Sequence, residues 1–263
     1  MIQTTITPNE ESVSAITEEA ISFLRSIPEP VLVRTSGGKD SIVTTYLVKM
    51  AGLRHSIQST LTGIDPPEMV RFIRENYSEC SFVRPKLSFW HLLTTHNPPG
   101  GTGRGIKWCC TKIKERPSAA NTIKNRVLGI RAEESTVRAG YERTNHVREQ
   151  AHFYPIFHWK EWQVWEFIER YKLPYPKLYD IGFDRVGCVI CPNHSGHHER
   201  YRALWPKHFD CFERYVKIWF EKRRLQGREM WHETAEDFLS DWYDGRFYYY
   251  RHKKIENQIG IFE

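Results

Sequence analysis

The stretch that most constrains the fold runs from Pro30 to Leu47, where a short apolar run meets a glycine-bearing turn and then a helical pattern. Val31 to Val33 are typical of a core strand, and apolar residues recur at helical spacing after Ile42. The turn reads Ser36-Gly37-Gly38-Lys39-Asp40-Ser41, and its glycines permit a sharp reversal that leaves backbone N–H groups open. Those groups, the helix N-terminus and the lysine would converge where an anion is favoured. The stretch therefore predicts a phosphate-binding loop.

The glycine spacing of this loop is not that of a Walker A loop, which is longer before its Lys-Ser/Thr pair. Ser36 and Ser41 add hydroxyl donors, and Asp40 has the chemistry to orient the loop or to hold a magnesium ion. A serine- and glycine-rich hairpin turn is the alternative interpretation. The strand pattern before the loop and the helical pattern after it argue against that alternative.

Strand and helix patterns alternate through the first two thirds of the chain. Strands are predicted at 55–61, 81–83 and 127–130, and helices at 17–24 and 69–76. Residues 132–150 are dense in charge and predict a solvated loop. The alternation indicates an α/β fold, in which a twisted parallel sheet has helices on both faces and a nucleotide binds at the carboxyl ends of its strands.

The aromatic content rises in the last third of the chain. Trp159 to Ile168 form an amphipathic pattern that predicts a helix with Trp162, Trp165 and Ile168 in the core. From His197 onward we expect two or three helices rich in Trp, Tyr, Arg and Lys. The expected organisation is a nucleotide-binding α/β domain over residues 1–192, which carries a cysteine cluster, and a helical extension over residues 193–263 packed on it.

The net charge and the length of the apolar runs limit the kinds of partner that the chain can have. The formal net charge of +6 favours an anionic partner such as a nucleotide, a nucleic acid or a sulfate ester. No signal pattern opens the chain and no apolar run approaches membrane length, so we expect a cytoplasmic protein with no membrane partner. The cations and aromatics of Lys222–Arg224 and Arg246–Lys254 suit nucleic-acid contact, and equally a solvated basic face over an aromatic core.

Four of the six cysteines form a second constraint, as an adjacent Cys109-Cys110 pair and a Cys188-x-x-Cys191 turn. A Cys-x-x-Cys turn directs two thiolates to one ion or cluster, and an adjacent pair can complete four ligands. A structural zinc site is the plain alternative. Two adjacent cysteines can bind different iron atoms of one cluster more easily than they can bind a single metal ion, which favours a [4Fe–4S] cluster. A disulfide or a thioredoxin-like redox site is disfavoured, because no redox helix pattern accompanies the turn.

Taken together, these motifs resemble the phosphoadenylylsulfate (PAPS) reductase family of the ATP pyrophosphatase (adenine nucleotide alpha-hydrolase) superfamily. The shared motifs are Ser36 to Ser41, Thr62-Gly63-Ile64-Asp65 with Glu68, Trp108-Cys109-Cys110 with Lys114, Gly129-Ile130-Arg131 with Glu134, Ser135 and Arg138, Leu178-Tyr179, and Gly187-Cys188-x-x-Cys191-Pro192. The four cysteines resemble the iron–sulfur branch, which includes adenylylsulfate reductases and the sulfur-transfer ATPases of Dnd- and Ssp-type DNA phosphorothioation. Family reductases carry a nucleophilic cysteine in a C-terminal tail, whereas the last cysteine here is Cys211, in a predicted helix.

The resemblance implies an iron–sulfur ATP pyrophosphatase that activates an acceptor oxygen by adenylation for sulfur incorporation, most closely in DNA backbone phosphorothioation. It implies that Lys39, Asp40 and Arg131 are catalytic and that ATP and Mg²⁺ bind at Ser36, Gly37, Gly38, Lys39, Asp40, Ser41, Leu61, Thr62, Gly63, Arg131, Glu134, Ser135 and Arg138. It implies a [4Fe–4S] cluster on Cys109, Cys110, Cys188 and Cys191. The implied partners are a cysteine desulfurase, as the sulfur donor, and DNA or a DNA-processing complex.

Two other functions stay open. The first is an assimilatory adenylylsulfate or PAPS reductase that uses thioredoxin, in which Cys211 would have to be the nucleophile. The second is a nucleotide-responsive nucleic-acid-binding module with a structural metal. Among single residues, we expect His194, His197 and His198 to be surface histidines, and Glu133 and Glu134 either to orient Arg131 or magnesium or to face solvent.

Overall fold

The computed structural model describes residues 12–100, 108–192, 198–228, 230 and 232–245. The chain forms two compact units whose segments interleave. Unit 1 consists of residues 1–59, 68–82 and 121–186, and unit 2 of residues 60–67, 83–120 and 187–263. The domain boundary expected at residue 192 stays a prediction, since interleaved compact units need not fold independently.

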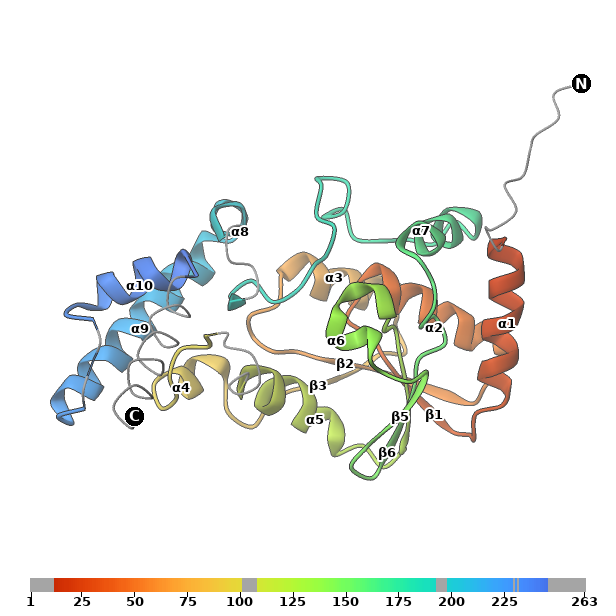
Figure 1. Cartoon of the computed structure of the whole chain (residues 1–263), viewed down its shortest axis with the longest axis horizontal. Helices are drawn as coiled ribbons and strands as arrows, with labels where there is room; N and C mark the ends of the chain where they lie inside the picture. Colours follow the sequence, from red (N-terminus) through yellow and green to blue (C-terminus); the bar gives the residue numbers. More distant parts are fainter. Residues whose placement is uncertain (1–11, 101–107, 193–197, 229, 231, 246–263) are drawn as a thin grey trace, which may run out of the picture. The chain divides into compact units, whose positions relative to one another are not determined.

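A six-stranded sheet has the strand order β3-β2-β1-β4-β6-β5 (Figure 1). The strands are β1 (Val31–Arg34), β2 (His55–Thr60), β3 (Ser81–Val83), β4 (Asn125–Leu128), β5 (Thr144–Val147) and β6 (Gln150–Phe153). β1 pairs in parallel with β2 and β4, and β4 pairs in parallel with β6. β5 runs antiparallel to β6. The predicted α/β fold with a mainly parallel sheet is confirmed, with helices around the sheet and an antiparallel strand at its edge.

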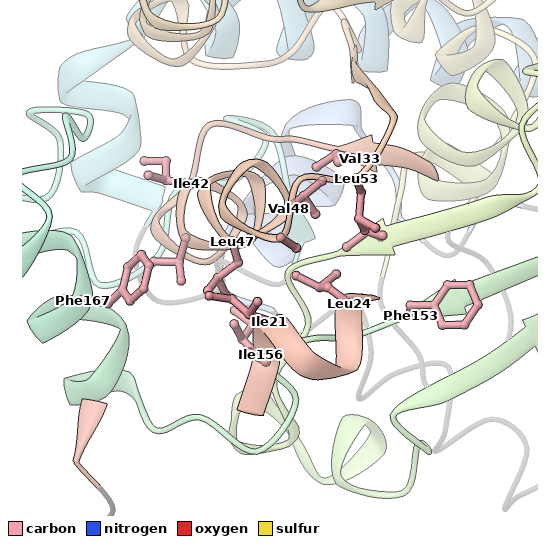
Figure 2. Close-up of a cluster of buried hydrophobic side chains, with 14 of the residues drawn as sticks. Ile21, Leu24, Val33, Ile42, Leu47, Val48, Leu53, Phe153, Ile156 and Phe167 are labelled. Carbon is pink, nitrogen blue, oxygen red and sulfur yellow. The ribbon is translucent and has the colours of Figure 1, made fainter. Parts of the chain in front are cut away.

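The core of unit 1 lies between the sheet and its long helices, which are α1 (Val13–Arg25), α2 (Lys39–Ala51), α3 (Pro67–Asn76) and α7 (Glu161–Arg170). α2 packs on β1 and β4 and against α1 and α7. Leu24 of α1, Leu47 of α2 and Phe167 of α7 are fully buried in this cluster (Figure 2). Each such side chain contributes about 1.5–3 kcal/mol by leaving water. The core therefore fixes α2, and with it the loop that precedes α2.

Residues 132–150 do not form the solvated loop that their charge predicts. They contain a short 3-10 helix, η2 (Ala132–Glu134), the short helix α6 (Thr136–Ala139) and the edge strand β5. An edge strand pairs on one side only, and β5 consists of Thr144, Asn145, His146 and Val147, which lack the apolar alternation typical of a strand.

α7 forms where the aromatic pattern predicts a helix, but one of its expected core residues is wrong. Trp162 is 43% exposed, whereas Val164, Phe167 and Ile168 are buried. Trp165 is partly buried against the core. Two residues three positions apart lie on the same side of a helix, but only one of them need lie at the centre of the buried face. The sequence pattern alone does not show which of the two tryptophans is buried.

Unit 2 is helical where the structure describes it. Its helices are α4 (Phe89–Leu93), the π-helix η1 (Cys110–Glu115), α5 (Arg116–Ala119), α8 (His198–Leu204), α9 (Pro206–Leu225) and α10 (Ala235–Tyr243). α9 packs against α4, α8 and α10. The three helices after His197 agree with the prediction, and the basic run Arg246–Lys254 lies outside the described residues. Within the described ranges, no helix is long and apolar enough to cross a membrane.

Candidate functional site

The predicted phosphate loop connects β1 to α2 in unit 1 (Figure 1). Gly37 has a φ of +74°, and a Cβ at this position would lie 2.9 Å from Cγ1 of Ile73. Both the backbone conformation and the available space therefore require glycine. Gly38 is the N-cap of α2 and has no side chain that could accept a hydrogen bond from the first turn. The first N–H groups of the helix must therefore find other partners.

Side-chain hydroxyls accept from four backbone N–H groups of the loop, of which that of Lys39 belongs to the first turn of α2. Ser36 N donates to Ser41 Oγ at 3.3 Å, Gly37 N to Thr35 Oγ1 at 3.2 Å, Gly38 N to Ser36 Oγ at 3.4 Å, and Lys39 N to Tyr179 Oη at 3.0 Å. These bonds are long for N–H···O bonds, except the last. Hydroxyls thus cover a set of donors that, at a helix N-terminus, is suited to a phosphate.

Lys39, the predicted phosphate lysine, is only 3% exposed. Its Nζ donates to the carbonyl oxygen of Asp184 at 2.8 Å and lies 3.4 Å from Glu161 Oε1 and 3.8 Å from Asp40 Oδ2. The ammonium group is therefore compensated within unit 1. A phosphate that binds here must join these partners or replace one of them.

Arg131, which follows β4, is the second buried cation and is 2% exposed. Its Nε lies 2.5 Å from Asp40 Oδ1, and its Nη1 lies 2.6 Å from Glu133 Oε2. Glu161 Oε2 lies 3.8 Å from Nη2. Burial works to lower the pKa of Arg131, but Asp40 and the other carboxylates outweigh it and raise that pKa. The guanidinium is thus held as a cation among three carboxylates.

Glu134 joins this network on its other side. It accepts the backbone N–H of Arg131 at 3.0 Å, forms an ion pair with Arg138, and lies 3.8 Å from Arg185 Nη2. Ser135 caps α6 by accepting the N–H of Arg138 at 3.2 Å. The structure therefore brings the loop, Asp40, Arg131, Glu134 and Arg138 together, and it shows Glu133 orienting Arg131. Their contact with a nucleotide stays a prediction.

Gly129 is required by the close approach of two backbones. A Cβ at this position would lie 2.6 Å from the carbonyl oxygen of Asp40 and 2.9 Å from the nitrogen of Ser41. The end of β4 thus touches the first turn of α2 directly. This contact positions Arg131, two residues later, beside Asp40.

Leu61, Thr62 and Gly63, the other predicted nucleotide residues, follow β2 and belong to unit 2. Thr62 donates its backbone N–H to Asp65 Oδ2 at 2.6 Å, and Gly63 has a φ of +81°. Asp65 thus stabilises the turn after β2. The nucleotide role of these three residues stays a prediction.

The four predicted metal cysteines all lie in unit 2. Cys188 is buried, and Cys109, Cys110 and Cys191 are half-buried. A hydrogen bond with Cys110, burial, and the charges of Cys188 and Cys191 all raise the pKa of the Cys109 thiol. The four thiols therefore act on one another electrostatically.

Lys114 provides a cation beside these thiols. Burial works to lower its pKa, but the charge of Cys188 and a hydrogen bond to it outweigh burial, so that the pKa is raised. Four cysteine thiols supply the donor chemistry of an iron–sulfur cluster, and a neighbouring ammonium group would offset part of the negative charge of such a cluster. In the part of the chain that the structure describes, however, no three cysteine, histidine or acidic side chains are arranged as a metal site. The metal assignment therefore stays a prediction.

One histidine prediction is wrong. His198 is buried, with Nδ1 3.1 Å from the carbonyl oxygen of Tyr243 and Nε2 3.3 Å from that of Cys191. α8 turns the His198 ring onto Trp242, with ring centroids 4.8 Å apart, and the residue type alone does not signal this packing. His194 and His197 lie outside the described residues.

Three residues that touch the loop were missed as site residues from the sequence. Tyr179 was noted only as part of a motif, and Glu161 stands in a pattern that signals an amphipathic helix. Asp184 contacts Lys39 through its backbone carbonyl, which leaves no signal in the residue type. Only the conjunction of Leu178-Tyr179 with the other motifs could have indicated this segment.

Comparison with known proteins identifies the family and supports the fold. A family model described as the phosphoadenosine phosphosulfate reductase domain matches residues 30–194. An uncharacterized protein of Methanocaldococcus jannaschii is 31% identical over 235 residues, which are 82% of this chain and 48% of that protein. An adenosine 5'-phosphosulfate reductase of Bacillus cereus is 22% identical over 200 residues, which are 69% of this chain and 85% of that protein.

Among solved structures, a phosphoadenylyl-sulfate (PAPS) reductase from Candida auris, in a phosphate complex, aligns with a TM-score of 0.50 at 16% identity. The alignment covers 70% of this chain and 98% of that chain, and it supports the fold alone. This chain spans 48% and 59% of the lengths of two archaeal relatives that it matches. Because the family model covers more than half of the sequence, the chain belongs to the phosphoadenosine phosphosulfate reductase domain family.

Proposed function

We propose that this protein is an ATP pyrophosphatase that adenylates an acceptor oxygen and so prepares it for sulfur incorporation, with the DNA backbone as the acceptor. The observation that carries the proposal is the loop of unit 1, where the N-terminus of α2 and the buried cations Lys39 and Arg131 lie together. Two buried cations beside the N-terminus of a helix suit a polyphosphate.

The chemistry consists of two substitutions. The acceptor oxygen attacks the α-phosphorus of ATP, and the bond from that phosphorus to the bridging oxygen breaks and releases pyrophosphate. A sulfur nucleophile then attacks the adenylated centre, and AMP leaves with the acceptor oxygen. With sulfur supplied at the sulfide level, neither step oxidises or reduces anything. Sulfur supplied as a persulfide by a cysteine desulfurase also requires a thiol reductant that delivers two electrons.

The charged residues in and beside the loop would assist the first substitution, in which ATP releases pyrophosphate. Lys39 and the N–H groups of α2 would stabilise the charge that develops on pyrophosphate. Asp40 would hold Arg131 toward the phosphates, since its Oδ1 lies 2.5 Å from Arg131 Nε. Mg²⁺ usually binds through one or two carboxylates together with substrate phosphates. Glu161, whose side chain is 47% exposed, is more available for that role than Asp40 at 17%.

We further propose that Cys109, Cys110, Cys188 and Cys191 hold a [4Fe–4S] cluster. Such a cluster supplies thiolate-held iron that can hold or relay sulfur. Lys114 would offset part of its negative charge, as it does for the Cys188 thiol. The cytoplasmic location and the partnership with a desulfurase and DNA are parts of the same proposal.

A reductase is the second candidate function, and the similarity to the Bacillus cereus adenosine 5'-phosphosulfate reductase favours it. In that case a thiolate would attack the sulfur of the activated sulfate, and AMP would leave. Cys211 is half-buried in α9, with its Sγ 3.8 Å from Arg214 Nη2. Cys211 would have to supply that sulfur nucleophile.

The experiment that separates the two uses protein purified without oxygen. We expect that ATP, Mg²⁺, cysteine, a desulfurase and a thiol reductant together introduce phosphorothioate linkages into DNA, detected by mass spectrometry after nuclease digestion. A Lys39→Met variant should lose this activity, and a Cys211→Ser variant should keep it. Sulfite formed from adenylylsulfate or PAPS, abolished by Cys211→Ser and without sulfur in DNA, would contradict the proposal and favour the reductase.

A further inference from the structure

The Tyr179 hydroxyl lies at the N-terminal end of α2, within unit 1. Its oxygen accepts the Lys39 N–H at 3.0 Å, and a Cβ built on Gly38 would lie 3.2 Å from it. The N–H groups of the first helical turn are the donors that a bound phosphate uses. The phenol oxygen therefore lies where the anion is expected to bind.

Neighbouring side chains fix the position of this ring. Trp165 of α7 meets it edge-on, with ring centroids 5.1 Å apart and an interplanar angle of 83°. The Lys39 ammonium lies 5.6 Å from the ring centroid. These contacts use the ring and not the hydroxyl, so a phenylalanine at this position would keep them.

The hydroxyl hydrogen of Tyr179 remains available for a further hydrogen bond. A phenol oxygen that accepts one hydrogen bond still has its own O–H to donate. Among the residues that the structure describes, none accepts that hydrogen. Burial raises the pKa of Tyr179 to about 12, so the phenol keeps its hydrogen at neutral pH. A preorganised donor beside a helix N-terminus and a buried lysine is suited to an anionic oxygen.

We infer that Tyr179 is a binding residue of the nucleotide site, which takes the Lys39 N–H and donates its own hydrogen to a phosphate oxygen of ATP or pyrophosphate. This inference rests on the proposed function of the loop as an ATP site. The competing possibility is that the hydroxyl only fills the loop and leaves when a phosphate arrives. The two possibilities predict effects of opposite sign when the hydroxyl is removed.

The test is calorimetric titration of wild-type protein and Tyr179→Phe with Mg-ATP and with pyrophosphate. We expect the variant to bind both ligands about tenfold more weakly, the loss typical of one hydrogen bond to a charged group. Tyr175→Phe is the matched control, because the Tyr175 hydroxyl bonds to Asp180 Oδ1 at 3.0 Å on the surface. It should bind both ligands as the wild type does.

Three outcomes would overturn the inference. Equal or tighter binding by Tyr179→Phe would show that the hydroxyl gives nothing to the ligand, and it would leave the ATP site intact. An equal loss in Tyr175→Phe would show that the effect is not local to the loop. Failure of the wild-type protein to bind either ligand would overturn the ATP site and the inference together. Ligand-free melting curves of both variants that match the wild type would confirm that the comparison concerns folded protein.

Discussion

Replacing Arg131 by methionine is expected to abolish pyrophosphate release and to lower the free energy of unfolding by about 3 kcal/mol, which is typical when one partner of a buried ion pair is removed. The loss follows because Asp40, whose side chain is only 17% exposed, would lose the guanidinium that lies 2.5 Å away. Denaturant unfolding and a pyrophosphate assay measure the two effects. Lysine should not restore activity, since it cannot meet Asp40 and Glu133 through separate nitrogens.

Arg170→Met is the matched control for Arg131→Met. Arg170 also pairs with a carboxylate, Glu166, at 3.0 Å, but both side chains are about 40% exposed. An exposed pair of this kind contributes roughly 0.5 kcal/mol, so the control should retain its stability and activity. An Arg131→Met variant as stable and active as this control would contradict the role given to Arg131.

Gly129→Ala should be the most damaging single-methyl change near the loop. The new Cβ would lie 2.6 Å from the Asp40 carbonyl oxygen, which is backbone and cannot rotate away. Overpacking of this kind costs about 1–3 kcal/mol and would push the first turn of α2 away from β4. We therefore expect a clear loss of stability in urea and at least a tenfold loss of ATP affinity, equivalent to about 1.4 kcal/mol.

The control for this change is Gly140→Ala. The nearest atom to a Cβ there is the carbonyl oxygen of Val137 at 3.6 Å, which is an ordinary contact. Its effect on unfolding should stay within about 0.5 kcal/mol. If the two alanine variants unfold at the same urea concentration, the contact between β4 and α2 does not fix the loop as described.

The sequence predicted the fold well where a local pattern has a single physical explanation. The run from Val31 through the glycines into α2 is one such case, because only a strand, a left-handed glycine and a helix satisfy its pattern. It failed where burial is decided by distant partners. The sequence pattern predicts a loop where β5 forms, a core position for the exposed Trp162, and a surface position for the buried His198.

The candidate site also divides into features that a local sequence pattern predicts and features that depend on contacts between distant segments. The motifs single out the loop, Asp40 and Arg131, and the structure brings these residues together, while their binding role stays a prediction. They could not show that Lys39 and Arg131 are already compensated by Asp184, Glu133 and Glu161, because those contacts depend on how three separate segments pack. They also gave the four cysteines a metal role, for which the described residues supply the donor chemistry but not an assembled site.

The most direct test of the central claim is the position at which ATP is cleaved. Protein purified without oxygen, supplied with Mg-ATP, DNA, cysteine, a desulfurase and a thiol reductant, is expected to form AMP and pyrophosphate in equal amounts, and Lys39→Met should form neither. Chromatographic separation of nucleotides with an enzymatic pyrophosphate assay measures both products. Release of ADP and inorganic phosphate, or no turnover of ATP with or without DNA, would contradict the claim.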